Sequence, residues 1–290
     1  MQATVSLSQQ SSVYQIVTEQ IIKQLESGVA PWRKPWRTEA PCNLVTGREY
    51  RGVNPFLLAP QGYGSRYWLT FDQAQKLGGY IRKGEHSSIV TFWKIGDEKI
   101  TTDADGDEHK SRPFLLRFYR VFNVEQTEGI ADKLGIGNAS ARTPNLDKCE
   151  GIVAEMPNRP AIIQDGRAWY RPSTDTVGIP ARTAFNSTEE FFATLFHELT
   201  HSTGHASRVG REEIQNLNEF GSESYSKEEL VAELGAAMLC GITGITPKTI
   251  ENSASYLKTW IDVLKSDARM VVFAASHAQK AADYIRGVRP

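Results

Sequence analysis

The segment His197-Glu198-Leu199-Thr200-His201 constrains the fold of this 290-residue chain more than any other, because its chemistry requires a helix. At about 100° per residue, His197 and His201 lie about 40° apart on one helical face, so both imidazoles can face one point. Two imidazoles at positions i and i+4 fix two coordination positions of a zinc ion. Glu198 lies beside them and can accept a proton from a water on the same ion. We therefore predict a metal-binding helix with Glu198 as its catalytic residue.

The flanking sequence supports a helix from residue 188 to residue 205. Its apolar side chains occupy the arc opposite the two histidines, where they can anchor the helix in a core. Ser187 with Glu190 three residues later resembles a capping box, which opens a helix. The alternative is that the five-residue pattern arose by chance. The amphipathic spacing and the acids downstream favour the metal site.

The third ligand is not expected from the same helix. The metzincin pattern HExxHxxGxxH is followed as far as Gly204, but Ser207 stands where its third histidine belongs. His205 comes two residues too early, and on a continuing helix it could not easily close a tetrahedron around the ion. For His205 we therefore favour either a surface position or a supporting role beside a ligand.

A downstream helix offers a carboxylate instead. Residues 227–240 have helical apolar spacing, and on them Glu229 and Glu233 lie four apart on one face. In such a pair one acid can bind the ion while the other holds the free N–H of a ligand histidine. We predict Glu229 as the ligand and Glu233 as its supporting acid, with the reverse assignment left open. Glu228 fits a solvated acidic face.

The N-terminal half has the composition of a surface that binds a polyanion. Residues 31–94 contain ten basic and four acidic residues, with eleven aromatics among them. A non-specific site for single-stranded DNA needs cations along the phosphates and exposed aromatics on which bases stack. The candidate DNA contacts are Trp32, Arg33, Lys34, Trp36, Arg37, Arg48, Tyr50, Arg51, Arg82 and Lys83.

Core packing is the competing interpretation for every aromatic residue in this half. For Trp32 and Trp36 the two interpretations are evenly balanced, because both lie in the proline-rich segment PWRKPWR. Core packing is favoured for a second group, Trp68, Phe71, Phe92 and Trp93.

The order of predicted elements indicates an α+β chain of two domains, with limits at 1–128 and 147–290 and a linker at 129–146. The first half predicts a helix over 12–27, another after Thr70, and strands at 88–95 and 113–124. The acidic run DADGDE reads as the tip of a hairpin, since Gly106 comes too early for a calcium loop. The second half predicts helices at 146–155, 227–240 and about 253–285, with strands at 161–163, 168–171 and 176–179.

The remaining composition points to the cytoplasm and away from a membrane. Three cysteines lie far apart without a CxxC pair, which is typical of a reducing compartment. The N-terminus lacks the basic and apolar regions of a signal peptide, and no apolar stretch approaches the roughly 20 residues that span a bilayer.

Longer motifs in both halves resemble known domains. HELTHSTGH followed by YSKEELVAELGAAML resembles the zincin-like metallopeptidase domain of polyvalent mobile-element proteins. TGREYRGVN at 46–54, YWLTFDQAQKLGGYIRKGEHSSIV at 67–90 and YRVFNVEQT at 119–127 resemble the single-stranded-DNA-binding domain of ArdC-type antirestriction proteins. Together the two resemblances cover almost the whole chain.

This resemblance implies an N-terminal α/β module that binds single-stranded DNA and a C-terminal metallopeptidase fold that protects incoming plasmid DNA from host restriction. His197, Glu198 and His201 carry over directly, and Glu229 less firmly. The implied partners are single-stranded DNA and a host restriction component. The expected cofactor is one divalent ion, zinc or alternatively Mn²⁺ or another metal. A DNA-binding shield with a purely structural metal is the alternative function, and a nuclease or primase fragment is disfavoured.

Overall fold

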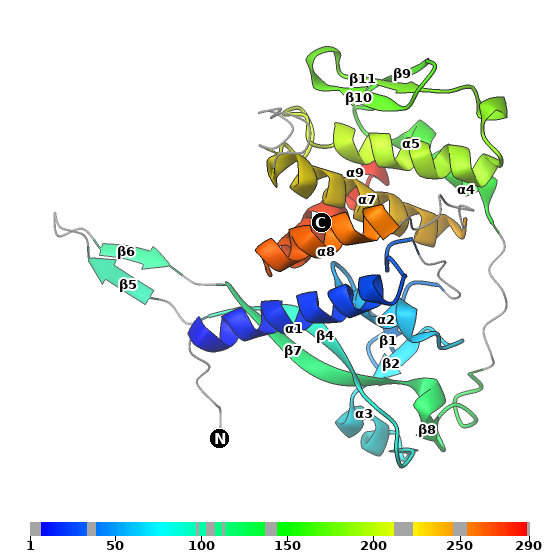
Figure 1. The fold of residues 1–290 in the computed structure, drawn as a ribbon. Helices are drawn as coiled ribbons and strands as arrows, with labels where there is room; N and C mark the ends of the chain where they lie inside the picture. The colour runs from blue at the N-terminus through cyan, green and yellow to red at the C-terminus, as the bar shows by residue number, and fades with distance from the viewer. Residues whose placement is uncertain are drawn as a thin grey trace.

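A computed structural model shows an α+β chain built as an N-terminal and a C-terminal domain, as predicted (Figure 1). It describes residues 7–33, 39–96, 99–102, 108–111, 114–136, 144–211, 223–245 and 254–288. Lys34, Trp36 and Arg37 lie outside these ranges. Among the described helices, none is long and apolar enough to cross a bilayer.

A four-stranded sheet is the centre of the N-terminal domain. Its strands, in spatial order, are β1 (Cys42–Asn43), β2 (Tyr67–Leu69), β7 (Phe114–Asn123) and β4 (Ser88–Ile95). Only the β1–β2 pairing is parallel. The accompanying elements are α1 (Leu7–Glu26), α2 (Asn54–Leu58), α3 (Phe71–Lys76) and the antiparallel pairs β3 (Tyr80–Ile81) with β8 (Thr127–Glu128) and β5 (Lys99–Thr102) with β6 (Glu108–Ser111).

The local sequence signals of this domain are confirmed. Thr70 caps α3 through a capping box, because its side chain accepts the N–H of Gln73 while the Gln73 side chain accepts the N–H of Thr70. β5 and β6 form the expected hairpin, which projects from the body of the molecule (Figure 1). Its turn at 103–107 lies outside the described residues.

Helices dominate the C-terminal domain and carry a small sheet on one side (Figure 1). The sheet has the order β10 (Trp169–Arg171), β11 (Thr176–Ile179) and β9 (Ala161–Gln164), with β11 parallel to β9. The main helices are α4 (Leu146–Glu155), α5 (Thr188–Ser202), α7 (Glu223–Thr243), α8 (Ala254–Ser266) and α9 (Met270–Ile285).

The helical run predicted over about 253–285 is in fact two helices. The chain turns between α8 and α9, where the Asp267 carboxylate accepts the backbone N–H of Arg269 at 2.9 Å. The Asp267 carbonyl accepts the N–H of Met270 at 3.1 Å, and the Ala268 carbonyl accepts the Thr18 hydroxyl of α1 at 2.7 Å. The break therefore depends on a tertiary contact with α1 and on local capping, neither of which interrupts the apolar period.

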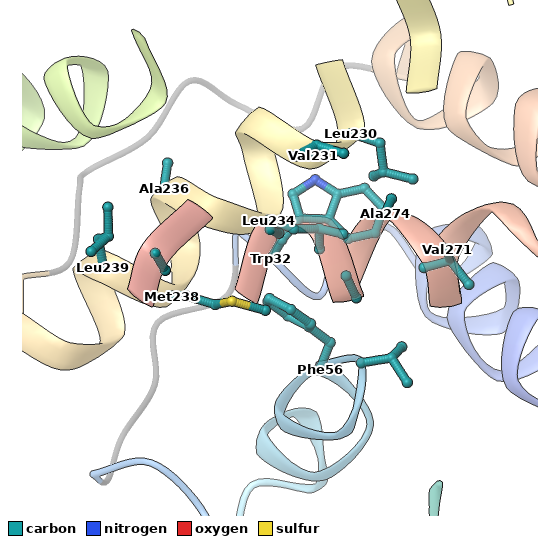
Figure 2. Packing of buried hydrophobic residues seen from close by; sticks show 14 of the residues in the cluster. Trp32, Phe56, Leu230, Val231, Leu234, Ala236, Met238, Leu239, Val271 and Ala274 are labelled. Carbon is teal, nitrogen blue, oxygen red and sulfur yellow. The ribbon is translucent and has the colours of Figure 1, made fainter. Parts of the chain in front are cut away.

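One hydrophobic core runs through both domains. Trp32 and Phe56 from the N-terminal half are buried among residues of α7 and α9, including Met238 and Ala274 (Figure 2). The apolar face of α1 joins the same cluster, with Ile21 fully buried. The domain limits at 128 and 147 remain a prediction. The hydrophobic core does not separate there, because one cluster contains residues from both sides of these limits.

Helices α5 and α7 approach each other closely at Gly235. A Cβ atom placed on Gly235 would lie 2.6 Å from Cγ2 and 2.8 Å from Oγ1 of Thr200, which is itself fully buried. Only hydrogen fits between the helices there, so glycine sets the distance between the two elements that carry the predicted metal ligands.

Replacing this glycine tests the contact. Gly235→Ala should lower the free energy of unfolding by about 1–3 kcal/mol, because the buried Thr200 leaves no space for the methyl group. Gly151→Ala in α4 is the matched control, since nothing lies within 4 Å of a Cβ there. It should raise stability by about 0.5–1 kcal/mol through helix propensity. Urea unfolding measures both, and equal effects would contradict the packing argument.

Candidate functional site

Helix α5 places the HExxH residues as the sequence predicts. Ser187 caps it by accepting the N–H of Glu190 at 3.1 Å, although the Glu190 carboxylate accepts from Asn186 at 3.0 Å and not from Ser187. Phe196 and Leu199 are buried on the core side. The helix ends at Ser202, three residues earlier than the expected limit of 205.

Three side chains from two helices converge on one point. Nε2 of His197 and Nε2 of His201 lie 3.1 Å apart. The Glu229 carboxylate of α7 lies 3.2 Å from Nε2 of His197 and 3.6 Å from Nε2 of His201. Their candidate ligand atoms all lie within 4.8 Å of one another. Two imidazoles and one carboxylate match the donor set of a catalytic zinc site, so these residues fit a divalent ion.

Glu228, and not Glu233, holds the ligand histidine. Oε1 of Glu228 lies 3.1 Å from Nδ1 of His201, on the side of the ring opposite to Glu229. The prediction assigned this role to Glu233 and left Glu228 in solvent, whereas Glu228 is only 6% exposed. Two consecutive glutamates on α7 therefore bracket one imidazole, and the carboxylate at Nδ1 fixes the tautomer that leaves Nε2 for a metal.

Arg211 is a supporting residue that the sequence analysis missed. Its Nε and Nη2 donate to the two oxygens of Glu228 at 2.8 and 2.6 Å. Its guanidinium also donates to the Thr203 hydroxyl and to the Thr200 carbonyl, at 2.6 and 2.8 Å. Arg211 thus satisfies the C-terminal end of α5 while it orients Glu228. No local sequence pattern indicates this role for an arginine that follows the end of the helix by nine residues.

Glu233 instead connects the metal domain to the N-terminal segment. Its carboxylate accepts hydrogen bonds from Arg33 at 2.7 Å and from the Tyr256 hydroxyl at 3.1 Å. The Arg33 guanidinium also lies over the Tyr256 ring, 3.7 Å from its centroid. Because both partners of the ion pair are largely buried, this contact fixes residue 33 against α7.

The glutamates change the charge state of the two histidines. Burial lowers the pKa of His201, but hydrogen bonds to Glu228 and Glu229 outweigh it and raise that pKa to about 10. Burial raises the pKa of Glu229, but hydrogen bonds from the two histidines hold it well below its usual value. In the absence of an ion, the site therefore retains a proton between imidazole and carboxylate.

Glu198, the predicted general base, is buried and has a raised pKa. Its side chain is only 8% exposed, and burial raises the pKa of its carboxyl although the charges of His201 and His197 act in the opposite direction. A carboxylate whose pKa moves towards neutrality accepts and returns protons more readily near pH 7. His205 lies outside the group of three ligands and accepts the N–H of Ser207 at Nδ1, 3.2 Å away.

The predicted DNA contacts are not brought to one place. Trp32 is 4% exposed, donates from Nε1 to the Tyr256 hydroxyl at 2.9 Å and packs edge-on against Trp260, so no base can stack on it. Arg33 is engaged with Glu233. Arg82 pairs with Glu85 on the surface.

Three other candidates share a cavity. Arg48, Tyr50 and Arg51 line a space of about 760 Å³ between the N-terminal sheet and α9. Arg82 and Lys83 do not line it.

Two aromatics of β4 also line this cavity, contrary to prediction. Phe92 and Trp93, expected in the core, are 42% and 40% exposed. Phe71 is likewise exposed, whereas Trp68 is buried as expected. The helix of Phe71 buries Ala74 and not Phe71 against the N-terminal core, so apolar character alone does not decide which side chain is buried.

Family comparisons agree with both halves of this geometry. A model of the N-terminal domain of the anti-restriction factor ArdC matches residues 11–122. A model of zincin-like metallopeptidases matches residues 148–277, which include both histidines and Glu229. The crystal structure of the antirestriction protein ArdC from plasmid R388 superposes with a TM-score of 0.74 at 35% identity, covering 96% of this chain and 99% of that one. This chain belongs to the ArdC antirestriction family.

Other relatives of this ArdC-family chain are known under different names. The R388 protein has also been solved with Mn(II), and that structure matches at a TM-score of 0.71 and 34% identity. An uncharacterized protein, y4eC, of Sinorhizobium fredii is 32% identical over 95% of this chain and 92% of its own length. Two Escherichia coli proteins called DNA primase TraC are 36% and 35% identical, and the chain spans 20% and 26% of their lengths.

The assignment of the supporting acid can be tested with paired substitutions. Glu228→Gln should weaken the binding of Zn²⁺ or Mn²⁺ about 10- to 100-fold, because His201 loses the carboxylate that orients it. Glu233→Gln, on the same helix, should leave the affinity close to that of the unaltered chain. Isothermal titration calorimetry measures both, with thermal melts to show that each variant folds. A larger loss in Glu233→Gln would restore the original assignment.

Metal binding should also release a proton. Since the pKa of His201 is raised to about 10, this ring is protonated at pH 7 and must lose the proton to offer Nε2 to an ion. Affinity should therefore rise with pH, about tenfold per unit, until the pH reaches that pKa. Titrations at pH 7 in buffers of different ionisation enthalpy should report about one proton per ion. A heat of binding that is the same in all buffers would contradict this charge state.

Proposed function

We propose that this chain is an antirestriction protein that binds single-stranded DNA through its N-terminal domain and hydrolyses a peptide bond at a divalent metal centre. The observation that carries the proposal is the joint placement of His197, His201 and Glu229 with Glu198 beside them. The target is a host restriction component or another DNA-bound protein, and the site of action is the cytoplasm. Three buried, unpaired cysteines suit that reducing compartment.

A divalent ion is supported by the ligand set and by the Mn(II)-bound structure of the R388 relative. When bound, a zinc or manganese ion would supply Lewis acidity to a water and to a peptide carbonyl. His197, His201 and Glu229 would hold it, and Glu228 with Arg211 would keep His201 in orientation. Zinc is the proposed metal because imidazole and carboxylate ligands suit it, and manganese is the alternative.

Glu198 performs the proton transfers in this proposal. Its buried carboxylate takes the proton that water loses as the water oxygen bonds to the carbonyl carbon. It then delivers the proton to the amide nitrogen, which leaves as the carbon–nitrogen bond breaks. The partial exposure of His197 and Glu229 leaves the ligand face accessible to a polypeptide.

Two other functions are weaker. In a DNA-binding shield the metal would only brace the C-terminal fold, but a structural site would not need a buried carboxylate with a raised pKa beside the ligands. Two-metal nucleic-acid chemistry needs several clustered carboxylates. In the part of the chain that the structure describes, the one group of three metal-binding side chains is His197, His201 and Glu229.

Glu198→Gln separates hydrolysis from shielding. The variant keeps the three ligands, so it should bind metal with near-normal affinity and lose protection of transferred DNA in a conjugation assay into a restricting host. Removal of the carboxylate base should slow hydrolysis by about 10²–10⁴-fold. Glu189→Gln, a surface change in the first turn of the same helix, is the control and should protect fully. Full protection by Glu198→Gln would favour the shield.

A further inference from the structure

A cavity between the two domains lies apart from the metal centre. Its walls come from residues between 43 and 54, from β4 and from α9, and its volume of about 760 Å³ is typical of a ligand pocket. None of the three metal ligands lines it. We call it the interdomain cavity.

Aromatic faces are available on one side of the interdomain cavity. β4 is an edge strand of its sheet, and Phe92 and Trp93, which leave it on opposite faces, both line the cavity. The Trp93 ring packs with the rings of Phe273 and Tyr14, at centroid distances of 6.1 and 6.5 Å, so a ligand on the other face meets Phe92. Tyr119 of β7 adds a third ring, 5.6 Å from that of Phe92 at an interplanar angle of 56°. Rings that are about 40% exposed in a concave site offer stacking surface to a planar ligand.

Positive charge remains among the lining residues of the cavity once the ion pairs are counted. Arg51 pairs with Asp283 of α9, and Glu49 pairs with Arg66. Arg48 and Lys280, both exposed, make no ion pair with any residue that the structure describes. An anionic group at the rim would therefore meet two available cations, one from each domain.

The polar side chains of the walls are already engaged. Asn43 and Gln73 donate to each other at 3.0 and 3.3 Å. Asn54 donates to the Thr91 carbonyl at 2.9 Å, and Gln279 accepts the N–H of Gly52 at 3.1 Å. These amides have few free groups with which to read the edge of a base, so recognition must rest on stacking and charge.

We propose that the interdomain cavity binds an unpaired nucleotide of single-stranded DNA, with the base stacked on Phe92 next to Tyr119 and the phosphate held by Arg48 and Lys280. The inference rests on the proposed function and gives the DNA site a location that includes α9 of the metallopeptidase domain. A duplex covers both faces of every base by stacking, so only an unpaired base can enter. Because the wall amides are engaged, binding should depend little on base identity.

The test measures binding of a fluorescently labelled oligo(dT) by anisotropy at fixed salt, using the full chain. Phe92→Ala should weaken binding about five- to hundredfold, the range of one lost stacking contact. Lys280→Glu should also weaken it, and more so at low salt. Tyr80→Ala, an exposed aromatic on β3, and Arg286→Glu, an exposed cation at the end of α9, are the matched controls and should bind normally. Thermal melts and metal titrations check the fold of each variant.

A second measurement locates the DNA directly. Oligonucleotides that contain 5-iodouracil should cross-link to the tryptic peptides of β4 or β7 that line the cavity. Unchanged binding by both Phe92→Ala and Lys280→Glu, with cross-links elsewhere, would overturn the cavity as the site while leaving DNA binding intact. Failure of the unaltered chain to bind oligo(dT), or equal affinity for a duplex, would overturn the inference together with the DNA-binding part of the proposed function.

Discussion

The packing of α5 against α7 at Gly235 brings the two histidines within reach of Glu229, and every property of the site depends on it. A wider separation would leave a pair of imidazoles without a third ligand. Arg211 stabilises the same contact, since it binds the Thr200 carbonyl of α5 and the Glu228 carboxylate of α7. The predicted metal ligands are thus held by two helices that Gly235 and Arg211 keep at a fixed distance.

The sequence predicts the part of this site that lies within a single helix. Spacing alone places His197 and His201 on one face. Because Ser207 stands where the metzincin pattern has its third histidine, the third ligand is expected from a later helix, where Glu229 lies close to both imidazoles. The choice between Glu228 and Glu233 depends on how α7 is rotated against α5, and apolar spacing does not determine that angle closely enough. Adjacent glutamates can reach both nitrogens of one ring only when the ring lies between them.

The sequence also does not predict which aromatic side chains are buried in the core. Trp32 follows a proline in a basic segment and nevertheless lies buried among α7 and α9 (Figure 2). Phe92 and Trp93 lie in a strand rich in apolar residues and are nevertheless exposed. Burial here is decided by the other half of the chain, because one core serves both domains. Strand and helix limits such as β4, β11 and α4 were predictable, since they depend on neighbours in the sequence.

The ion pair between Arg33 and Glu233 links the N-terminal half of the chain to α7. Glu233 lies one helical turn from the ligand Glu229 on α7, and the pair is shielded from solvent. Separating a buried ion pair is costly, because each charge would be left without its partner away from water. The pair therefore holds the N-terminal half against the helix that carries Glu228 and Glu229, and a displacement of Arg33 would be felt on α7.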